Sequence, residues 1–148
     1  DTDNNRVRKA REELAAKIIS PDTFIECECD ILAPCAMGGT INDKTIPLLQ
    51  CQGIAGAANN QLEKPENGKQ LQEAGILYAP DYVINAGGVI SARRPLSPGE
   101  SVSARETRFM VDNIYNKLLD LFKQANDEGI ATSSAADKIA EAKLAQYD

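Results

Sequence analysis

The sequence contains no histidine, and only 5% of its 148 residues are aromatic. Histidine is the most common general base of enzymes and a frequent zinc ligand, so its absence narrows the available chemistry. Four cysteines remain as candidate metal ligands, but Cys27 and Cys29 lie too close together for a typical zinc knuckle. We therefore expect reduced, mostly buried thiols, no metal, and no activated nucleophile at Cys35.

Positive charge and long apolar runs are also scarce. Acidic residues outnumber basic residues by 22 to 16, which gives a net charge of −6 and argues against nucleic acid as a partner. No apolar run approaches the roughly 20 residues that a membrane span requires. No charged-then-apolar leader is visible, so we expect a cytoplasmic protein. The G-x-G-x-x-G loop that cradles a dinucleotide pyrophosphate is absent as well.

Short apolar segments alternate with helical patterns in the first two thirds of the chain. Three segments are predicted to be strands: 30–33 and 53–55, which we expect to be buried, and 76–79. The predicted helices run from Asn4 or Asn5 to about 16, from Asn42 or Asp43 to 49, up to about Gly75, and onward from Asn85. This alternation predicts an α/β fold, in which a parallel sheet is connected by helical crossovers.

The last third of the chain follows another pattern. Residues 93–103 hold two Pro, one Gly and three Ser, which predicts a loop. A long amphipathic helix is predicted over 104–128, and Gly129 is placed to end it. Ser134 and Asp137 resemble a capping box that would begin a final helix. We therefore expect two C-terminal helices.

Small and amide side chains follow the end of each predicted strand. They are Cys35, Ala36, Ala57, Asn59, Asn60 and Asn85. Open parallel sheets bind ligands at the carboxyl ends of their strands. Small side chains let a ligand approach the backbone, and amides supply donors and acceptors. A simpler alternative is that these are turn residues chosen for conformation alone.

Asp3 and Asn4 lie where a strand would give way to the first helix. In dinucleotide folds a carboxylate at this position accepts hydrogen bonds from the adenosine ribose hydroxyls, and it repels a 2′-phosphate. Asp3 would therefore favour NAD over NADP. The alternative is that Asp3 caps the helix and has no ligand.

Three blocks carry a resemblance to a known family. They are CDILAPCAMGGTIN from Cys29 to Asn42, IAGAANNQL from Ile54 to Leu62, and YAPDYVINAGGVI from Tyr78 to Ile90. Together they resemble the nicotinamide-binding half of the glutamate, leucine, phenylalanine and valine dehydrogenases, most closely the leucine and phenylalanine members. The resemblance implies NAD as cofactor and a small L-amino acid as substrate, oxidised to a 2-oxo acid with release of ammonia.

The resemblance also suggests roles for individual residues. Cys35 and Ala36 would line the adenosine side of NAD, and Ala57 would lie against the nicotinamide ribose. Asn59 and Asn85 would hold the nicotinamide, whereas Asn60 and Val89 would contact the substrate. Ala92 stands where the leucine-type pattern has a branched apolar residue, and the continuation from Arg93 to Pro95 also departs from the family. The substrate need not be leucine.

By this resemblance, residues 1–92 form a truncated Rossmann-like domain without its first strand and glycine-rich loop, 93–103 a loop, and 104–148 the C-terminal helices. The family's catalytic Lys and Asp have no counterpart here, so we expect the isolated chain to be inactive and to bind NAD weakly. Uncovered sheet edges lead us to expect a homo-oligomer. One alternative is a non-catalytic binding module that works through its long helix. Another dinucleotide-fold enzyme, of methylene-tetrahydrofolate or shikimate type, is disfavoured by the block from Asn85 to Gly88.

Overall fold

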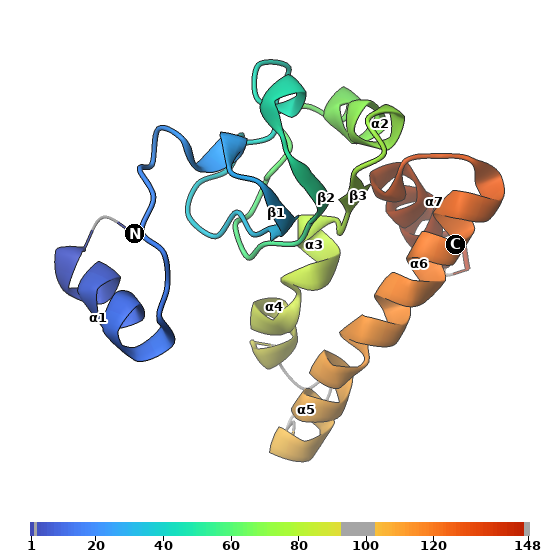
Figure 1. The fold of residues 1–148 in the computed structure, drawn as a ribbon. Coiled ribbons are helices and arrows are strands. Elements are labelled where there is room, and N and C mark those ends of the chain that lie inside the picture. Colours follow the sequence, from blue (N-terminus) through green and yellow to red (C-terminus); the bar gives the residue numbers. More distant parts are fainter. Residues whose placement is uncertain (2, 93–102, 147–148) are drawn as a thin grey trace.

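The chain folds around a small parallel sheet. The computed structural model describes residues 1, 3–92 and 103–146. In this part of the chain β1 (Cys29–Leu32), β2 (Cys51–Ile54) and β3 (Leu77–Tyr78) pair in sequence order, all parallel (Figure 1). Each strand lies within two residues of its predicted range. The predicted α/β fold with helical crossovers is confirmed.

One face of the sheet carries the main hydrophobic core. Leu32, Ile54 and Tyr78 stand in register across the three strands, and all three are buried. Helix α2 (Glu66–Glu73) covers this face and contributes the fully buried Leu71. Gly75 follows α2 with φ of 72°, a left-handed conformation that ends the helix as predicted.

The opposite face is half open. Ile31, Gly53 and Leu77 share the next register across the strands, and Ile31 is 56% and Leu77 50% exposed. The prediction of buried strands is therefore wrong for this face. Parallel sheets usually have helices packed on both faces. The apolar composition of a strand does not reveal whether a helix covers each of its faces.

Helix α1 (Asn4–Leu14) stands apart from the sheet (Figure 1). None of its residues is buried, and the apolar Leu14 is 77% exposed. The helix is capped by Asp3, whose Oδ1 accepts the backbone N–H of Asn5 at 2.8 Å and of Arg6 at 3.4 Å. The cap is thus one residue earlier than the predicted Asn4 or Asn5.

The elements between the strands are short. The 3₁₀ turn η1 (Phe24–Glu26) precedes β1, and η2 (Ile46–Leu48) is all that forms of the helix predicted over 42–49. After β3, a helical turn α3 (Asp81–Ile84) is followed by α4 (Gly87–Ser91). Asn85 lies between these two and does not begin a helix, which corrects the prediction.

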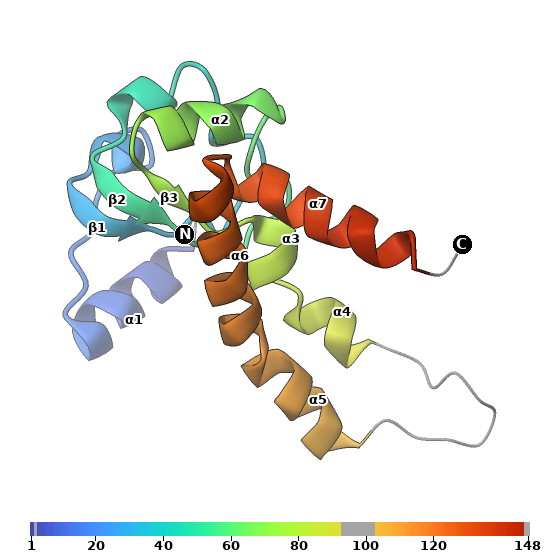
Figure 2. The same cartoon turned by 90° about the vertical axis from the view of Figure 1, so that its right-hand side faces the viewer.

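The predicted long helix is two helices, α5 (Ala104–Asp112) and α6 (Ile114–Glu128), interrupted at Asn113. Ser103 and Glu106 form a capping box at the start of α5, whereas most of the predicted loop, residues 93–102, lies outside the described residues. Gly129, with φ of 65°, ends α6 as predicted. Together α5 and α6 form one extended arm beneath the sheet (Figure 2).

The final helix α7 (Thr132–Leu144) begins two residues before the predicted Ser134 and has no side-chain cap. Its buried Ala135 and Ala136 pack on Leu121 and Ala125 of α6 in a second, smaller core. Helix α7 also contacts β3 and α2, and a Cβ added at Gly68 of α2 would lie 2.2 Å from Ser133 Oγ. None of the described helices is long and apolar enough to cross a bilayer.

Candidate functional site

The loops that follow β1 and β2 are joined through their backbones. The N–H of Ala58 donates to the carbonyl of Pro34 at 2.9 Å, and the N–H of Gly39 donates to the carbonyl of Asn60 at 2.7 Å. Gly56 allows this approach, because a Cβ there would lie 2.1 Å from the Pro34 oxygen. The two loops therefore form one rigid platform at the carboxyl ends of the strands.

The loop after β3 is attached to the same platform by side chains. Asn85 Nδ2 donates to Asn59 Oδ1 at 2.7 Å and lies 3.5 Å from the carbonyl oxygen of Ala57. Asn59 is exposed and Asn85 is half-buried. The pair presents amide groups at the surface, beside the small side chain of Ala57, which is also exposed.

Cys35 completes the group from the β1 side. Its Sγ accepts the backbone N–H of Ala57 at 3.5 Å, and both Cys35 and its neighbour Ala36 are exposed. The structure thus brings together Cys35, Ala57, Asn59, Asn60 and Asn85. Hydrogen bonds link Cys35 to Ala57 and link Asn85 to Ala57 and Asn59, and Asn60 follows Asn59 in the chain. The juxtaposition follows from parallel strands ending at one edge. The ligand roles of these residues stay predictions.

Asp3 and Asn4 are not part of this group. The carboxylate of Asp3 caps α1 and lies 3.6 Å from Arg6 Nε, on a helix that stands apart from the sheet (Figure 1). The capping alternative is therefore realised, and the ribose role of Asp3 stays a prediction. Val89, on α4, is 79% exposed and free to contact something else.

All four cysteines are free thiols, as expected, but Cys35 is exposed and the other three are only half-buried. The expectation that they would be mostly buried is wrong. Burial nevertheless raises the pKa of the Cys29 and Cys51 thiols, which keeps both protonated at neutral pH. No cluster of three metal-binding side chains occurs among the described residues.

Asp81 and Tyr78 support the platform, and the sequence-based prediction assigned neither of them this role. Asp81 accepts hydrogen bonds from the N–H of Asn60 and from the hydroxyl of Tyr78. Burial, and then the bond to Asp81, raise the pKa of the Tyr78 hydroxyl well above its usual range. An available signal was the Pro80-Asp81 pair after a predicted strand, because an acidic residue after Pro often begins a helix.

A third missed residue, Gln61, is fully buried inside the second loop. Its Nε2 donates to the carbonyls of Gly56 at 2.7 Å and Ala58 at 3.0 Å. These bonds satisfy backbone oxygens that the tight turn would otherwise leave unpaired. Nothing in the local pattern distinguishes this glutamine from an exposed one.

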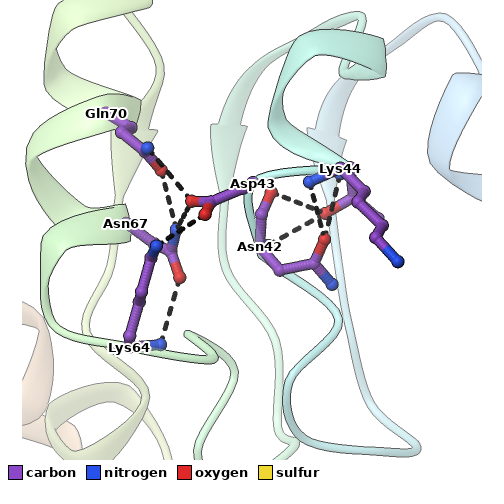
Figure 3. Close-up of polar contacts among 7 residues, drawn as sticks. Asn42, Asp43, Lys44, Lys64, Asn67 and Gln70 are labelled. Atoms are coloured by element: carbon purple, nitrogen blue, oxygen red, sulfur yellow. Dashed lines mark hydrogen bonds and ion pairs between the residues drawn. The ribbon is translucent and has the colours of Figure 1, made fainter.

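A polar cluster fastens the outer part of the two loops (Figure 3). Asp43 accepts hydrogen bonds from Lys64 Nζ at 2.5 Å, from Asn67 Nδ2 at 3.0 Å and from Gln70 Nε2 at 3.1 Å. The Lys64 hydrogen bond is the main reason that the pKa of Asp43 lies below its usual range. The cluster joins the turn after β1 to the start of α2.

The surface hollows lie elsewhere. One of about 260 Å³ runs between α2, β3 and α6, and a second of about 770 Å³ lies at the amino ends of β1 and β2. Neither is lined by Asn59, Asn60 or Asn85. Within the strand-end group, Cys35, Ala57, Asn59 and Asn60 are exposed at the surface.

Comparison with known proteins identifies the fold's relatives. A family model described as Glutamate/Leucine/Phenylalanine/Valine dehydrogenase matches residues 2–146. Leucine dehydrogenase of Thermoactinomyces intermedius is 44% identical over 144 residues, which are 97% of this chain and 38% of that protein. L-tryptophan dehydrogenase of Nostoc punctiforme is 41% identical over 145 residues, 97% of this chain and 40% of the relative.

The solved structures agree. The crystal structure of L-tryptophan dehydrogenase from Nostoc punctiforme superposes with a TM-score of 0.86 at 37% identity, covering 99% of this chain and 43% of the other. A hetero-hexameric glutamate dehydrogenase from Thermus thermophilus, at 21% identity and a TM-score of 0.62 over 89% of this chain and 33% of its own, shares the fold. This chain spans about two fifths of the curated relatives it matches. It belongs to the glutamate/leucine/phenylalanine/valine dehydrogenase family.

Proposed function

We propose that this chain is the cofactor-binding part of an NAD-dependent L-amino-acid dehydrogenase. The observation that carries the proposal is the Asn59–Asn85 amide pair beside Ala57, gathered from two loops at the carboxyl ends of neighbouring parallel strands. That is the edge of an open sheet where dinucleotides bind. Relatives named as leucine, tryptophan and valine dehydrogenases support the reaction class.

The residues present fit the nicotinamide end of NAD. The Asn59 and Asn85 side chains together offer one amide donor group and one carbonyl acceptor beyond their mutual bond, which matches a carboxamide that needs both. Exposed Ala57 leaves room for a ribose against the backbone. Cys35 and Ala36, on the next loop, would face the adenosine side. When bound, NAD supplies the acceptor for the substrate's hydride.

The platform's chemical task is orientation. Asn59 and Asn85 would hold the nicotinamide in one orientation when NAD is bound. Correct orientation of reacting groups can lower a reaction barrier by about 7 kcal/mol or more in the best cases. Asn60, whose side chain makes no hydrogen bond to another described residue, is available to the substrate's polar groups. Exposed Val89 would form part of the pocket for the substrate side chain.

The proposed substrate class rests on two exposed residues, Val89 and Ala92. Val89 is apolar, and Ala92, also exposed, replaces the branched residue of the leucine-type pattern. A smaller residue enlarges the pocket, so we propose a branched-chain or aromatic L-amino acid. The names of the relatives, which include both leucine and tryptophan dehydrogenases, support this range.

Proton transfer would be carried out by residues outside this chain, because the family's catalytic Lys and Asp have no counterpart here. We therefore propose that the isolated chain is inactive and that the whole enzyme is a cytoplasmic homo-oligomer. Ile31 and Leu77 are exposed on one face of the sheet, which favours a further segment or subunit packed on this face in the whole enzyme. A steady-state assay of the isolated chain with L-leucine and NAD is expected to show no turnover above blank.

A chimera tests the proposed function directly. Residues 2–146 replace the matching segment of the Thermoactinomyces leucine dehydrogenase, and NADH formation from L-leucine, L-phenylalanine and L-tryptophan is followed by absorbance. We expect NAD-dependent turnover, and we expect Asn85→Ala to raise the KM for NAD about tenfold, the cost of about one good hydrogen bond. Asn116→Ala, at an exposed position of α6, is the matched control and is expected to change nothing.

A chimera that melts cooperatively but forms no NADH with any of the three amino acids would overturn the proposal. That outcome would favour the second candidate, a non-catalytic module that binds partners through α5 and α6. The exposed Phe109, Tyr115 and Leu119 on these helices give that candidate its one specific observation.

A further inference from the structure

Asp81, the first residue of α3, carries a carboxylate in a residue that is 7% exposed, and its side chain bonds the backbone of Asn60 and the hydroxyl of Tyr78. We propose that Asp81 is a positioning residue: it holds the backbone of the Asn59–Asn60 turn in the one shape that aims the Asn59–Asn85 amide pair outward. This inference rests on the proposed function for its purpose, but its physical content concerns the apo chain.

Both carboxylate oxygens of Asp81 are committed to donors. Oδ2 accepts the backbone N–H of Asn60 at 2.7 Å, and Oδ1 accepts the hydroxyl of Tyr78 at 2.8 Å. The hydroxyl oxygen of Tyr78 in turn accepts the backbone N–H of Asp81 at 3.2 Å. Hydrogen bonds to an ionised acceptor in a buried setting are among the stronger ones in proteins.

The bond matters because Asn60 holds an unfavourable backbone conformation. Its φ is 52°, in the left-handed region that residues with a side chain avoid, although asparagine tolerates it better than most. The bond from Asp81, one strand and 21 positions away along the chain, fixes the N–H direction that the left-handed conformation requires.

The Asn60 conformation sets the direction of its neighbours. Its carbonyl accepts the N–H of Gly39 at 2.7 Å, which ties the turn to the β1 loop. On the preceding residue, Asn59 Oδ1 accepts Asn85 Nδ2. A rotation at Asn60 would break both links together, so Asp81 controls the joint between all three loops.

Asparagine cannot do the same work as aspartate here. An amide has one acceptor and one donor group, whereas this position faces the Asn60 N–H and the Tyr78 hydroxyl, both of which donate. In Asp81→Asn the new NH₂ would meet one of the two donors. Tyr78→Phe is the matched control. It removes the hydrogen bond from the Tyr78 hydroxyl to the Asp81 carboxylate and keeps the carboxylate that accepts the Asn60 N–H.

The experiment measures amide hydrogen exchange and side-chain amide signals by NMR on the ¹⁵N-labelled full chain, without cofactor. In the wild type we expect the Asn60 N–H to be protected although the residue is exposed, and the Asn85 side-chain amide to be shifted by its bond to Asn59. In Asp81→Asn we expect Asn60 exchange to accelerate about tenfold or more and the Asn85 signal to move to the position of a free amide. In Tyr78→Phe we expect less than about a threefold change at Asn60.

A purely structural role would instead lower protection throughout the sheet, in step with the melting temperature. Uniform loss of protection in Asp81→Asn, or loss at Asn60 that is as large in Tyr78→Phe, would overturn the proposal. If Asp81→Asn does not fold, Asp81→Ser removes the same carboxylate with a smaller side chain, and the same two outcomes decide. A separate experiment titrates the wild-type chain with NADH. If the Asn85 side-chain signal does not respond to NADH, the proposed function is contradicted. The hydrogen-exchange result on Asp81→Asn does not depend on this titration.

Discussion

The strand-end platform and helix α1 show two ways of building a candidate cofactor site. Both were assigned to NAD by sequence, the platform through Cys35, Ala57, Asn59 and Asn85, and α1 through Asp3 and Asn4. The platform is fastened by backbone bonds and two amide contacts within the chain. Helix α1 has no buried residue and stands away from the sheet (Figure 1).

The difference lies in where each region finds its partners. The platform's partners are the neighbouring loops, which parallel strands bring to one edge in any chain that forms this sheet. On α1 no residue is buried, and the apolar Leu14 is 77% exposed. A ligand role for the platform therefore rests on geometry within the chain, whereas the role of Asp3 depends on a surface that something else must supply.

The sharpest test of this contrast compares two leucines. Leu71, on α2 and fully buried, is expected to destabilise the chain by about 3 kcal/mol when changed to Ala, because a cavity opens under the sheet. Leu14→Ala on α1 is expected to cost less than about 0.5 kcal/mol, since its side chain is exposed. Urea unfolding measures both. Equal losses would mean that α1 is packed in solution and the contrast is false.

Two glycines test the platform itself. Gly56→Ala places a methyl group 2.1 Å from the Pro34 carbonyl oxygen, and because backbone must move we expect a loss of about 2 to 3 kcal/mol. Gly88→Ala, in α4, meets nothing within 4 Å and is expected to be neutral or to stabilise by up to about 1 kcal/mol through helix propensity. Thermal and urea unfolding of the two variants should therefore differ in sign. A neutral Gly56→Ala would contradict the close approach of the two loops.

The smallest expected effect concerns pH. The pKa of Asp43 is lowered chiefly by its hydrogen bond to Lys64, so the folded chain prefers the ionised form. The stability from this group is fully present above the usual Asp range and is lost as pH falls below about 4, through the folded pKa. NMR titration should show Lys64→Met raising the pKa of Asp43, and Lys9→Met, on α1, leaving it unchanged. Because the pair is exposed, added salt should weaken the effect.

Much of the sheet could be predicted from the sequence, because short apolar segments between helical patterns leave few arrangements. The strand-end group was predictable for the same reason: Asn59 and Asn85 each follow a strand, and strand ends converge. The left-handed Gly75 and Gly129 were recognisable as helix stops, since glycine there carries no steric penalty.

Other features depend on contacts between residues distant in sequence. Asp81 supports the platform through a bond to Asn60, 21 positions earlier. The bonds of Gln61 are local, but the sequence does not mark its side chain as buried. The helices α5 and α6 are interrupted at Asn113, although the predicted apolar stripe continues through this position. The start of α7 was misplaced because Asp137 resembles a cap residue in sequence. In the structure it accepts a hydrogen bond at 2.8 Å from the hydroxyl of Tyr82, a partner 55 positions earlier. The exposure of the sheet face around Ile31 and Leu77 was not predicted, because the composition of a strand does not show whether a helix packs on it.

The contact between Gly68 and Ser133 limits how the chain can be shortened. Any version trimmed ahead of Thr132 would remove α7, which contacts α2, and would uncover Leu121 and Ala125 of the second core. Crystallisation or fusion designs should therefore keep the terminus beyond Leu144, and a tag is better placed there than on the short connection between α6 and α7.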